Sequence, residues 1–240
     1  MSREVPDRAM AIYAHPDDPE VACAGTLAGW AAKGCEIAVL SVASGDKGGV
    51  RRDAKLAGRR ATESRAAAEI VGASSWDTLG YGDGEFDNDL ELRSKLVERI
   101  RAHRPEVVLT SDPTAVFFGA NYVNHRDHRV VGWAVLDAVA PASGVGSYFP
   151  EAGAPHRVPE LWLSATLEPD WWVDIATTID TKVAALACHR SQLVDTQALG
   201  EDDLAGDHEV VAGLVRHRAE LDGRGAGLEL AESYRRLILG

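Results

Sequence analysis

The chain has 240 residues, of which 45% are hydrophobic and 26% are charged, and its formal net charge at pH 7 is -12. This composition is ordinary for a folded protein and excludes a largely disordered chain. The acidic balance argues against a nucleic-acid-binding protein, which needs a basic face to displace counterions, and against an anionic membrane surface as a partner. A chain of this length suits a single domain over residues 1–240.

The sequence shows no targeting or membrane-spanning segment. The first eight residues carry no apolar leader core, and no apolar run approaches the ~18 residues of a membrane span. The three cysteines, Cys23, Cys35 and Cys188, are an odd number without framework spacing, which fits a reducing compartment. We therefore expect a cytoplasmic protein without a membrane anchor.

The first predicted element is a buried strand from Met10 to Ala14, which runs directly into His15-Pro16-Asp17-Asp18. Polar side chains at the end of a buried strand are typical of the binding crevice of an open α/β sheet. Adjacent carboxylates beside a histidine repel one another unless a cation or a proton shares the site. This stretch is the first indication of a metal.

A βαβ unit follows. Residues 21–33 form an Ala-rich helix ended by Gly34, residues 37–42 form a strand, and Ser44–Gly49 form a Gly-rich loop. This loop lacks both phosphate-binding glycine spacings, which makes nucleotide binding the weaker interpretation.

The rest of the chain continues in the same alternation. We expect strands at 75–79 and 107–110, helices at 60–71 and 90–103, and a long loop through Tyr122 that is a candidate lid or pocket wall. The remaining expectations are a helix to about Ala140, a pocket-forming loop at 141–159, strands at 161–167 and 172–175, a helix at 177–189, and helices and loops over the last forty residues.

A second polar motif reads Asn124-His125-Arg126-Asp127-His128. The two histidines are three apart and share a helical face, and the apolar residues after His128 continue its spacing. His15, Asp18 and His128 together give two imidazoles and one carboxylate, a set typical of catalytic zinc with a fourth position for water. Iron(II) is compatible with the same ligands. Asp17 is then free to act as a base.

Each of these residues also has a structural alternative. Asp17 or Asp18 could cap the following helix, and His125, Asp127 and His128 could cap or shield the start of theirs. The joint presence of a ligand set, a free carboxylate and a further histidine favours the metal site.

The chain resembles the PIG-L/LmbE-type family of zinc-dependent N-deacetylases. The likeness rests on His15-Pro-Asp-Asp-Pro-Glu20 and His125-Arg-Asp-His128, and it extends to Ser44-Gly-Asp46, Arg60-Ala-Thr-Glu63 and the segment Lys182–Gln192, so that it covers roughly residues 8–195. Arg126 departs from the pattern, because proline is common at that position. The resemblance implies an α/β, single-domain, Rossmann-like sheet, largely parallel, with helices on both faces.

The resemblance and the metal chemistry together imply a hydrolase that removes an acyl group, acetyl foremost, from the amide nitrogen of an N-acetylated amino sugar or sugar conjugate. Asp17 would be the base, His125 would stabilise the oxyanion as an imidazolium or protonate the leaving amine, and Asp127 would orient a histidine. Asp46, Arg60 and Asp83 are the predicted substrate contacts.

Two other classes of function stay open. One is a nucleotide- or cofactor-binding α/β protein that uses the loop Ser44–Gly49. The other is a non-catalytic relative, which we would expect to have lost Asp17. The sequence leaves open the substrate, from mycothiol-type sugars and glycolipids to glycopeptide antibiotics and chitin fragments, and it leaves open a homo-oligomer.

Overall fold

The computed structural model describes residues 5–48, 53–197 and 204–239, with the side chains of 194–197 and 204–208 outside the description. Its centre is a seven-stranded sheet in the order β3-β2-β1-β4-β7-β9-β8. The strands are β1 (Arg8–Tyr13), β2 (Glu36–Ala43), β3 (Ser75–Tyr81), β4 (Val107–Ser111), β7 (Glu160–Ser164), β8 (Trp171–Asp174) and β9 (Ala231–Ile238). The first five strands in this order, from β3 through β2, β1 and β4 to β7, pair in parallel. Strand β9 pairs antiparallel with both β7 and β8.

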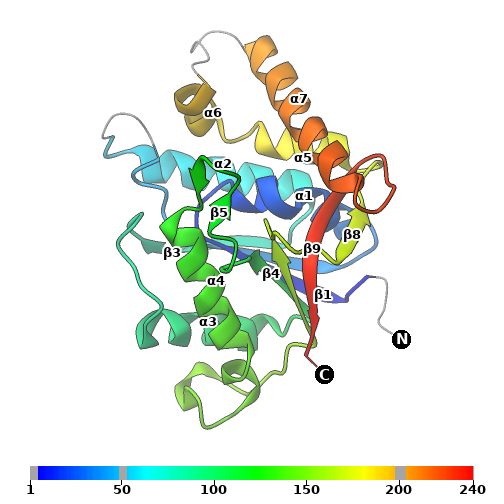
Figure 1. The fold of residues 1–240 in the computed structure, drawn as a ribbon. Coiled ribbons are helices and arrows are strands. Elements are labelled where there is room, and N and C mark those ends of the chain that lie inside the picture. Colours follow the sequence, from blue (N-terminus) through cyan, green and yellow to red (C-terminus); the bar gives the residue numbers. More distant parts are fainter. Residues whose placement is uncertain (1–4, 49–52, 198–203, 240) are drawn as a thin grey trace.

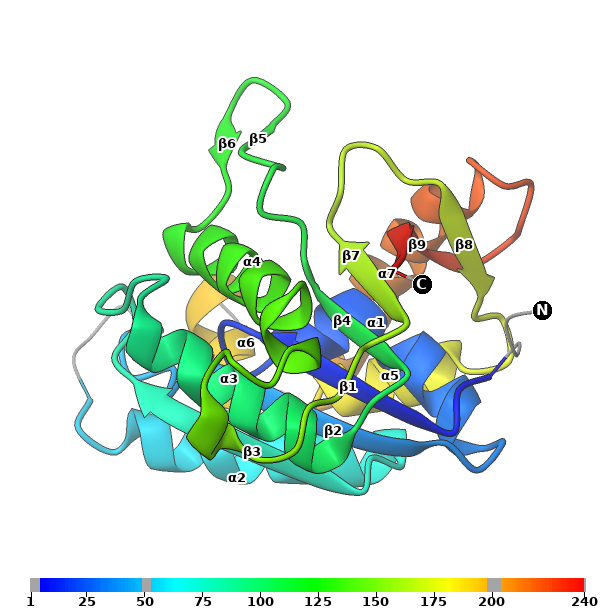
Figure 2. The same cartoon turned by 90° about the horizontal axis from the view of Figure 1, so that it is seen from below.

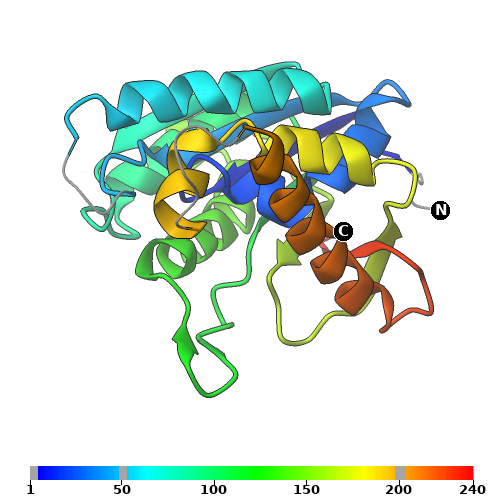
Figure 3. The same ribbon diagram turned by 90° about the horizontal axis from the view of Figure 1, so that it is seen from above.

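Helices cover both faces of this sheet (Figures 1 and 2). One face carries α1 (Asp18–Ala31), α2 (Leu56–Val71) and α5 (Ile179–Leu186), and the other carries α3 (Leu90–His103) and α4 (Arg126–Val139). Two further helices, α6 (Arg190–Gln197) and α7 (Leu204–Gly223), lie beside α5 on the first face (Figure 3). The expected α/β fold with a largely parallel sheet is therefore confirmed.

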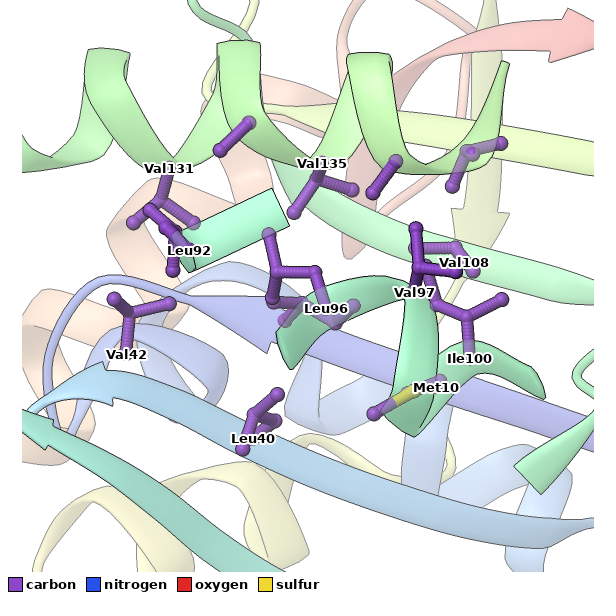
Figure 4. Packing of buried hydrophobic residues seen from close by; sticks show 14 of the residues in the cluster. Met10, Leu40, Val42, Leu92, Leu96, Val97, Ile100, Val108, Val131 and Val135 are labelled. Carbon is purple, nitrogen blue, oxygen red and sulfur yellow. The ribbon is translucent and has the colours of Figure 1, made fainter. Parts of the chain in front are cut away.

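The side chains of β1 explain why its sequence is continuously apolar. Met10 and Ile12 point into the core under α3 and α4, whereas Ala9, Ala11 and Tyr13 point into the core under α1 and α2. A strand that is buried on both faces has no solvent side on which polar residues could alternate. Figure 4 shows the first of these cores, in which side chains of α3 and α4 meet those of the sheet.

The C-terminal segment differs from expectation. Helices and loops were expected over the last forty residues, but Ala231–Ile238 forms β9, which lies inside the sheet. The charged residues of this segment interrupt the apolar pattern from which a buried strand would be predicted. Arg236 is neutralised by the Glu160 carboxylate of the neighbouring strand, at 2.6 Å between Nη2 and Oε1.

Several boundaries also move. Helix α1 begins at Asp18 rather than residue 21, because Pro19 fits the first helical turn. Strand β7 ends at Ser164, and the helix expected at 177–189 is the shorter α5, with α6 beginning separately at Arg190. The expected long loop contains a hairpin, β5 (Phe117–Phe118) and β6 (Tyr122–Val123), which projects from the body of the molecule (Figure 2).

The segment 141–159 is built around one buried guanidinium. Arg101 of α3 donates to six carbonyl oxygens, those of Ala142, Ser143, Val145, Tyr148, Phe149 and Gly153. The short 3₁₀ helices η1 (Ala142–Gly144) and η2 (Pro150–Ala152) lie in this segment. It contributes none of the residues that line the cavity described below, so the expected pocket-forming role is not supported.

Among the described helices, none is both long enough and apolar enough to cross a lipid bilayer.

Candidate metal centre and active site

The two polar motifs meet where the strand order of the sheet reverses. From β1 the chain moves to β2 and β3 on one side, and then returns to β4 on the other side of β1. The loops that leave the carboxyl ends of β1 and β4 therefore diverge, and such a switch point is where open α/β sheets bind ligands. His15 to Asp18 follow β1, and the chain from β4 leads through the hairpin into α4.

The turn after β1 holds its carboxylates in an unusual backbone conformation. Asp17 has φ 94°, a value that a residue with a side chain adopts at a cost of about 1–3 kcal/mol. The Oδ2 atom of Asp18 accepts the backbone N–H of His15 at 2.8 Å, which closes the turn. Asp17 precedes the first residue of α1, but its side chain makes no capping hydrogen bond. The helix-cap interpretation of Asp17 is therefore not supported.

The second motif, Asn124–His128, lies at the start of helix α4. His125 is the N-cap residue, and its Nδ1 accepts the backbone N–H of Asp127 at 3.2 Å. His128 follows in the first turn. The helix approaches β4 closely at Gly132, where an added Cβ would lie 2.5 Å from the carbonyl oxygen of Ser111. Glycine at this position thus lets α4 bring its first turn to the end of the sheet.

His15, Asp18 and His128 come together as a group that could hold a metal ion. Their ligand atoms lie within 4.8 Å of one another. The Nε2 of His128 is 3.1 Å from Oδ1 of Asp18, and the Nδ1 of His15 is 3.4 Å from Oδ2 of the same carboxylate. The ligand atoms of a second group, His15, His125 and Asp127, also lie within 4.8 Å of one another. The donor types of the first group, two imidazoles and a carboxylate, fit zinc.

The other nitrogen of each histidine is already engaged. Nε2 of His15 lies 3.1 Å from Oδ2 of Asp127, and Nδ1 of His128 lies 3.1 Å from the side-chain oxygen of Asn124. Asp127 is fully buried and also accepts the N–H of Gly84 at 2.7 Å. Such outer contacts fix the tautomer of a metal-binding histidine. They favour the first group, because they leave Nδ1 of His15 and Nε2 of His128 directed at Asp18.

The carboxylates around His15 and His128 favour positive charge at this site, as the pKa values of the two histidines indicate. Burial alone would lower the pKa of His15, but the hydrogen bonds to Asp127 and Asp18 outweigh it and raise that pKa to about 10. Burial likewise opposes protonation of His128, and the charge of Asp18 outweighs it and raises the pKa. Without a cation, these carboxylates therefore favour protons on the two imidazoles, and a metal would compete with those protons.

Asp17 stands beside this group with a different environment. Burial raises the pKa of its carboxyl to about 6, although the guanidinium of Arg60 opposes the rise. Arg60 is itself buried, and its Nη2 lies 3.2 Å from Oδ2 of Asp17. The same guanidinium donates to the carbonyl oxygens of Pro16 and Gly45, so it holds the turn that carries Asp17. A carboxyl with a pKa near neutrality suits a general base.

The histidine rings of the two motifs form a compact cluster. The ring centroids of His125 and His15 are 4.9 Å apart, and those of His125 and His128 are 5.5 Å apart. Burial, and then the neighbouring His15, lower the pKa of His125. Because its Nδ1 accepts a backbone N–H, the neutral ring carries its proton on Nε2. The neutral ring thus has an N–H group to donate, and the role of His125 in stabilising an oxyanion or protonating an amine stays a prediction.

The three predicted substrate contacts have partners inside the protein. Asp46 accepts the N–H of Asp83 at 2.9 Å, and Asp83 accepts the N–H groups of Gly45 and Lys47 at 3.0 and 3.2 Å. These contacts join the loops after β2 and β3, and Arg60 lies behind them. None of the three lines the cavity described below, and their contact with substrate stays a prediction.

The same contacts bear on the nucleotide-binding alternative. A phosphate cradle needs free backbone N–H groups, and here those of Gly45 and Lys47 already donate to Asp83. Gly49, the end of that loop, lies outside the described residues. Arg126, the departure from the family pattern, donates to the carbonyl of Phe86 at 2.6 Å and pairs with Asp87, so it supports the loop after β3.

A cavity of about 650 Å³ opens from this centre, and Asp17, Asp18 and His128 form part of its wall. Its wall also contains residues to which the sequence assigned no role. Asn124 is one, and its spacing of four residues before His128 is a signal that could have found it. His189 is another. It is fully buried and its Nε2 lies 3.1 Å from Oε2 of Glu20, a contact across 169 residues that no local pattern indicates.

Comparison with known proteins agrees with this geometry. The chain matches the family model described as PIG-L, GlcNAc-PI de-N-acetylase, over residues 10–139. It is 31% identical over 192 residues to diacetylchitobiose deacetylase of Thermococcus kodakarensis, covering 77% of this chain and 70% of the relative. It is 27% identical over 246 residues to 1D-myo-inositol 2-acetamido-2-deoxy-alpha-D-glucopyranoside deacetylase of Rhodococcus erythropolis, covering 78% and 81%.

The fold has a similar counterpart among solved structures. N,N'-diacetylchitobiose deacetylase from Pyrococcus horikoshii superposes with a TM-score of 0.82 at 24% identity, covering 97% of this chain and 84% of that one. The named relatives in sequence are deacetylases, and the expectation of an enzyme that hydrolyses amide bonds is confirmed. The matched model spans both polar motifs, His15–Asp18 and Asn124–His128, and more than half of the sequence, and the chain belongs to the PIG-L family.

Proposed function

We propose that this protein is a zinc-dependent deacetylase that removes the acetyl group from the nitrogen of an N-acetylated amino sugar or sugar conjugate. One observation carries the proposal. The ligand atoms of His15, Asp18 and His128 converge within 4.8 Å, next to the Asp17 carboxyl, whose pKa burial raises to about 6. The relatives support the substrate class, since their names specify deacetylation of diacetylchitobiose and of an acetamido sugar joined to inositol.

His15 through Nδ1, Asp18 through its carboxylate and His128 through Nε2 would hold the zinc. Zinc in such a set supplies a Lewis acid that acidifies water and polarises an amide carbonyl. The Asp17 carboxylate accepts the proton of the attacking water and returns it to the amide nitrogen as the C–N bond breaks. The hydroxyl of the water stays on the carbonyl carbon, so the products are acetate and a free amine.

The remaining polar residues of the site would stabilise the developing charge and hold the metal ligands and the base in place. Nε2–H of His125 donates to the carbonyl oxygen as negative charge develops there, a role that its neutral form can fill. Asp127 and Asn124 keep His15 and His128 in the tautomers that the metal requires. Arg60 keeps Asp17 in place. A cytoplasmic location and a homo-oligomeric assembly stay predictions.

The test is acetate release by the zinc-loaded protein from N-acetylglucosamine and N,N'-diacetylchitobiose, with metal content measured in the same samples. We expect about one zinc per chain, turnover of at least one of the two sugars, and a loss of about 10²- to 10⁴-fold in kcat for Asp17→Asn. That variant should keep its zinc, whereas Asp18→Ala should lose it. Turnover by Asp17→Asn at the wild-type rate would overturn the assignment of the base. Absence of zinc from the wild type after loading would overturn the metal site.

A further inference from the structure

The cavity that contains the catalytic residues is larger and more apolar than an acetamido sugar alone requires. Its volume of about 650 Å³ lies in the range of cavities that enclose ligands of drug size. Beyond Asp17 and His128 it continues between the β5–β6 hairpin and helices α5, α6 and α7. We define the apolar subsite as six of the hydrophobic side chains of this part, Val21, Phe118, Tyr122, Leu186, Leu193 and Leu214.

Three of these side chains are strongly exposed. Val21 is 56% exposed, Tyr122 is 53% exposed and Leu214 is 50% exposed. Hydrophobic side chains that gather on a concave surface, and not singly on a convex one, mark a place that a ligand covers. They come from three separate elements, the first turn of α1, the hairpin and α7, so that the subsite has walls on more than one side.

Charged residues in the wall of the cavity are already paired with one another. Nζ of Lys182 lies 2.6 Å from Oε1 of Glu232, and Nε of Arg218 lies 3.4 Å from Oδ1 of Asp222. Each of these cations thus faces a carboxylate of the protein. A neutral group would have the smallest desolvation cost on entering the cavity, because it carries no charge that would need a partner there.

We propose that the apolar subsite binds a neutral, hydrophobic group attached to the amino sugar, so that the preferred substrate is an amphipathic N-acetylglucosaminide and not a free sugar. This inference rests on the proposed function. The sugar would lie at Asp17, Asp18 and His128, and its alkyl or aryl substituent would extend along Val21 and Leu186 toward Leu214. Continuity with the catalytic residues in one cavity favours a part of the substrate over a second protein molecule as the occupant.

The first test compares the methyl and hexyl glycosides of N-acetylglucosamine, in both anomers, with zinc-loaded protein. Each buried methylene strengthens binding about fourfold, so two buried methylenes of the hexyl chain already give more than tenfold. We expect the KM of the hexyl glycoside to be at least about tenfold lower than that of the methyl glycoside. A calorimetric Kd for the same pair, measured with zinc-loaded Asp17→Asn, gives a readout that does not depend on turnover.

The second test locates the preference on α7. Leu214→Ser should reduce the hexyl-to-methyl preference at least about fivefold. Leu221→Ser is the matched control, because Leu221 is 42% exposed on the same helix and does not line the cavity, and it should keep the preference. If Leu214→Ser fails to fold, Tyr122→Ser on the hairpin replaces it, with its neighbour Val123→Ser as the control.

The outcomes separate this inference from the proposed function. Equal KM and Kd values for both glycosides, with turnover of both, would overturn the subsite and leave the deacetylase intact. Tighter binding of the hexyl glycoside without turnover would overturn the deacetylase and keep the subsite. If Leu214→Ser instead lowers the molar mass in light scattering and leaves the preference unchanged, the surface joins copies of this chain and the inference is wrong.

Discussion

Asp127 accepts a hydrogen bond from His15 with 3.1 Å between Oδ2 and Nε2, and it thereby joins the turn after β1 to the first turn of α4. Without this contact the imidazole of His15 could rotate and present either nitrogen to a cation. We expect Asp127→Asn to weaken zinc binding about 10- to 100-fold, because the amide is a poorer partner for the ring. Competition against a chelator measures this. Asp137→Asn, on the exposed side of the same helix, should leave the affinity unchanged.

Zinc binding should release protons at pH 7. The pKa of His15, about 10, means that this ring holds a proton in the metal-free protein that a metal must displace, and the raised pKa of His128 favours a second such proton. The affinity should therefore rise with pH until the rings are neutral in the metal-free protein. Calorimetry of zinc binding in buffers of different ionisation enthalpy counts the protons, and we expect between about one and two per zinc. A value near zero would contradict the assignment of these two ligands.

Activity should fall in acid as Asp17 takes up a proton. Its pKa of about 6 means that the base is ionised above that pH, so kcat/KM should rise with pH and level off above it. A bound cation nearby moves this limb to lower pH. Arg60→Gln should move it to higher pH, because the guanidinium is the largest influence that lowers the pKa of Asp17. A pH profile in which Arg60→Gln shifts the limb downward would contradict the position of Arg60.

Arg101 should be a large contributor to stability. Its removal leaves several buried carbonyl groups without a donor, and each such loss costs about 1–3 kcal/mol. We expect Arg101→Met to lower the free energy of unfolding by about 3 kcal/mol or more in denaturant titration. Arg99→Met is the control on the same helix. Its exposed pair with Asp77 is worth at most about 1 kcal/mol. Equal losses for the two variants would contradict the account of segment 141–159.

The close approach of α4 to β4 gives a further prediction. In Gly132→Ala the new methyl group would lie 2.5 Å from the carbonyl oxygen of Ser111 and 2.9 Å from Cβ of Pro113. Helix α4 must shift to relieve this, and we expect both a lower melting temperature and weaker zinc binding through His128. Gly213→Ala in α7, where nothing lies within 4 Å, should be neutral or slightly stabilising. Unchanged zinc affinity in Gly132→Ala would show that the helix can adjust without moving His128.

The convergence of His15, Asp18 and His128 could be predicted because these residues stand in two short motifs that follow predictable elements. The contacts around it could not. Substrate contact by Arg60 stays a prediction, but the sequence did not indicate that its guanidinium contacts Asp17, Pro16 and Gly45 across a turn whose shape depends on the φ of Asp17. That angle cannot be predicted from the sequence, since positive φ is uncommon for residues other than glycine. Asn124 is different, because its spacing from His128 was visible.

The fold shows the same division. Strand β1 could be predicted from its unbroken apolar run, whereas β9 could not. Glu232 of β9 pairs with Lys182, fifty residues away, and Arg236 pairs with Glu160, seventy-six residues away. A charged residue in a buried strand is stable only when such a partner is present, and one-dimensional periodicity contains no information on distant partners.

The place of β9 has a consequence for how the protein is made. This strand lies between β7 and β8, and its Ala231 and Glu232 line the cavity beside α5 and α7. The carboxylate of Glu232 also accepts the N–H groups of Gly25 and Thr26 in α1, the helix that begins at Asp18. During synthesis, β1 to β4 can pair as they leave the ribosome, but the sheet keeps a gap beside β7 until residues 231–238 follow. A nascent chain therefore contains His15, Asp18 and His128 well before it contains the strand that completes the cavity wall.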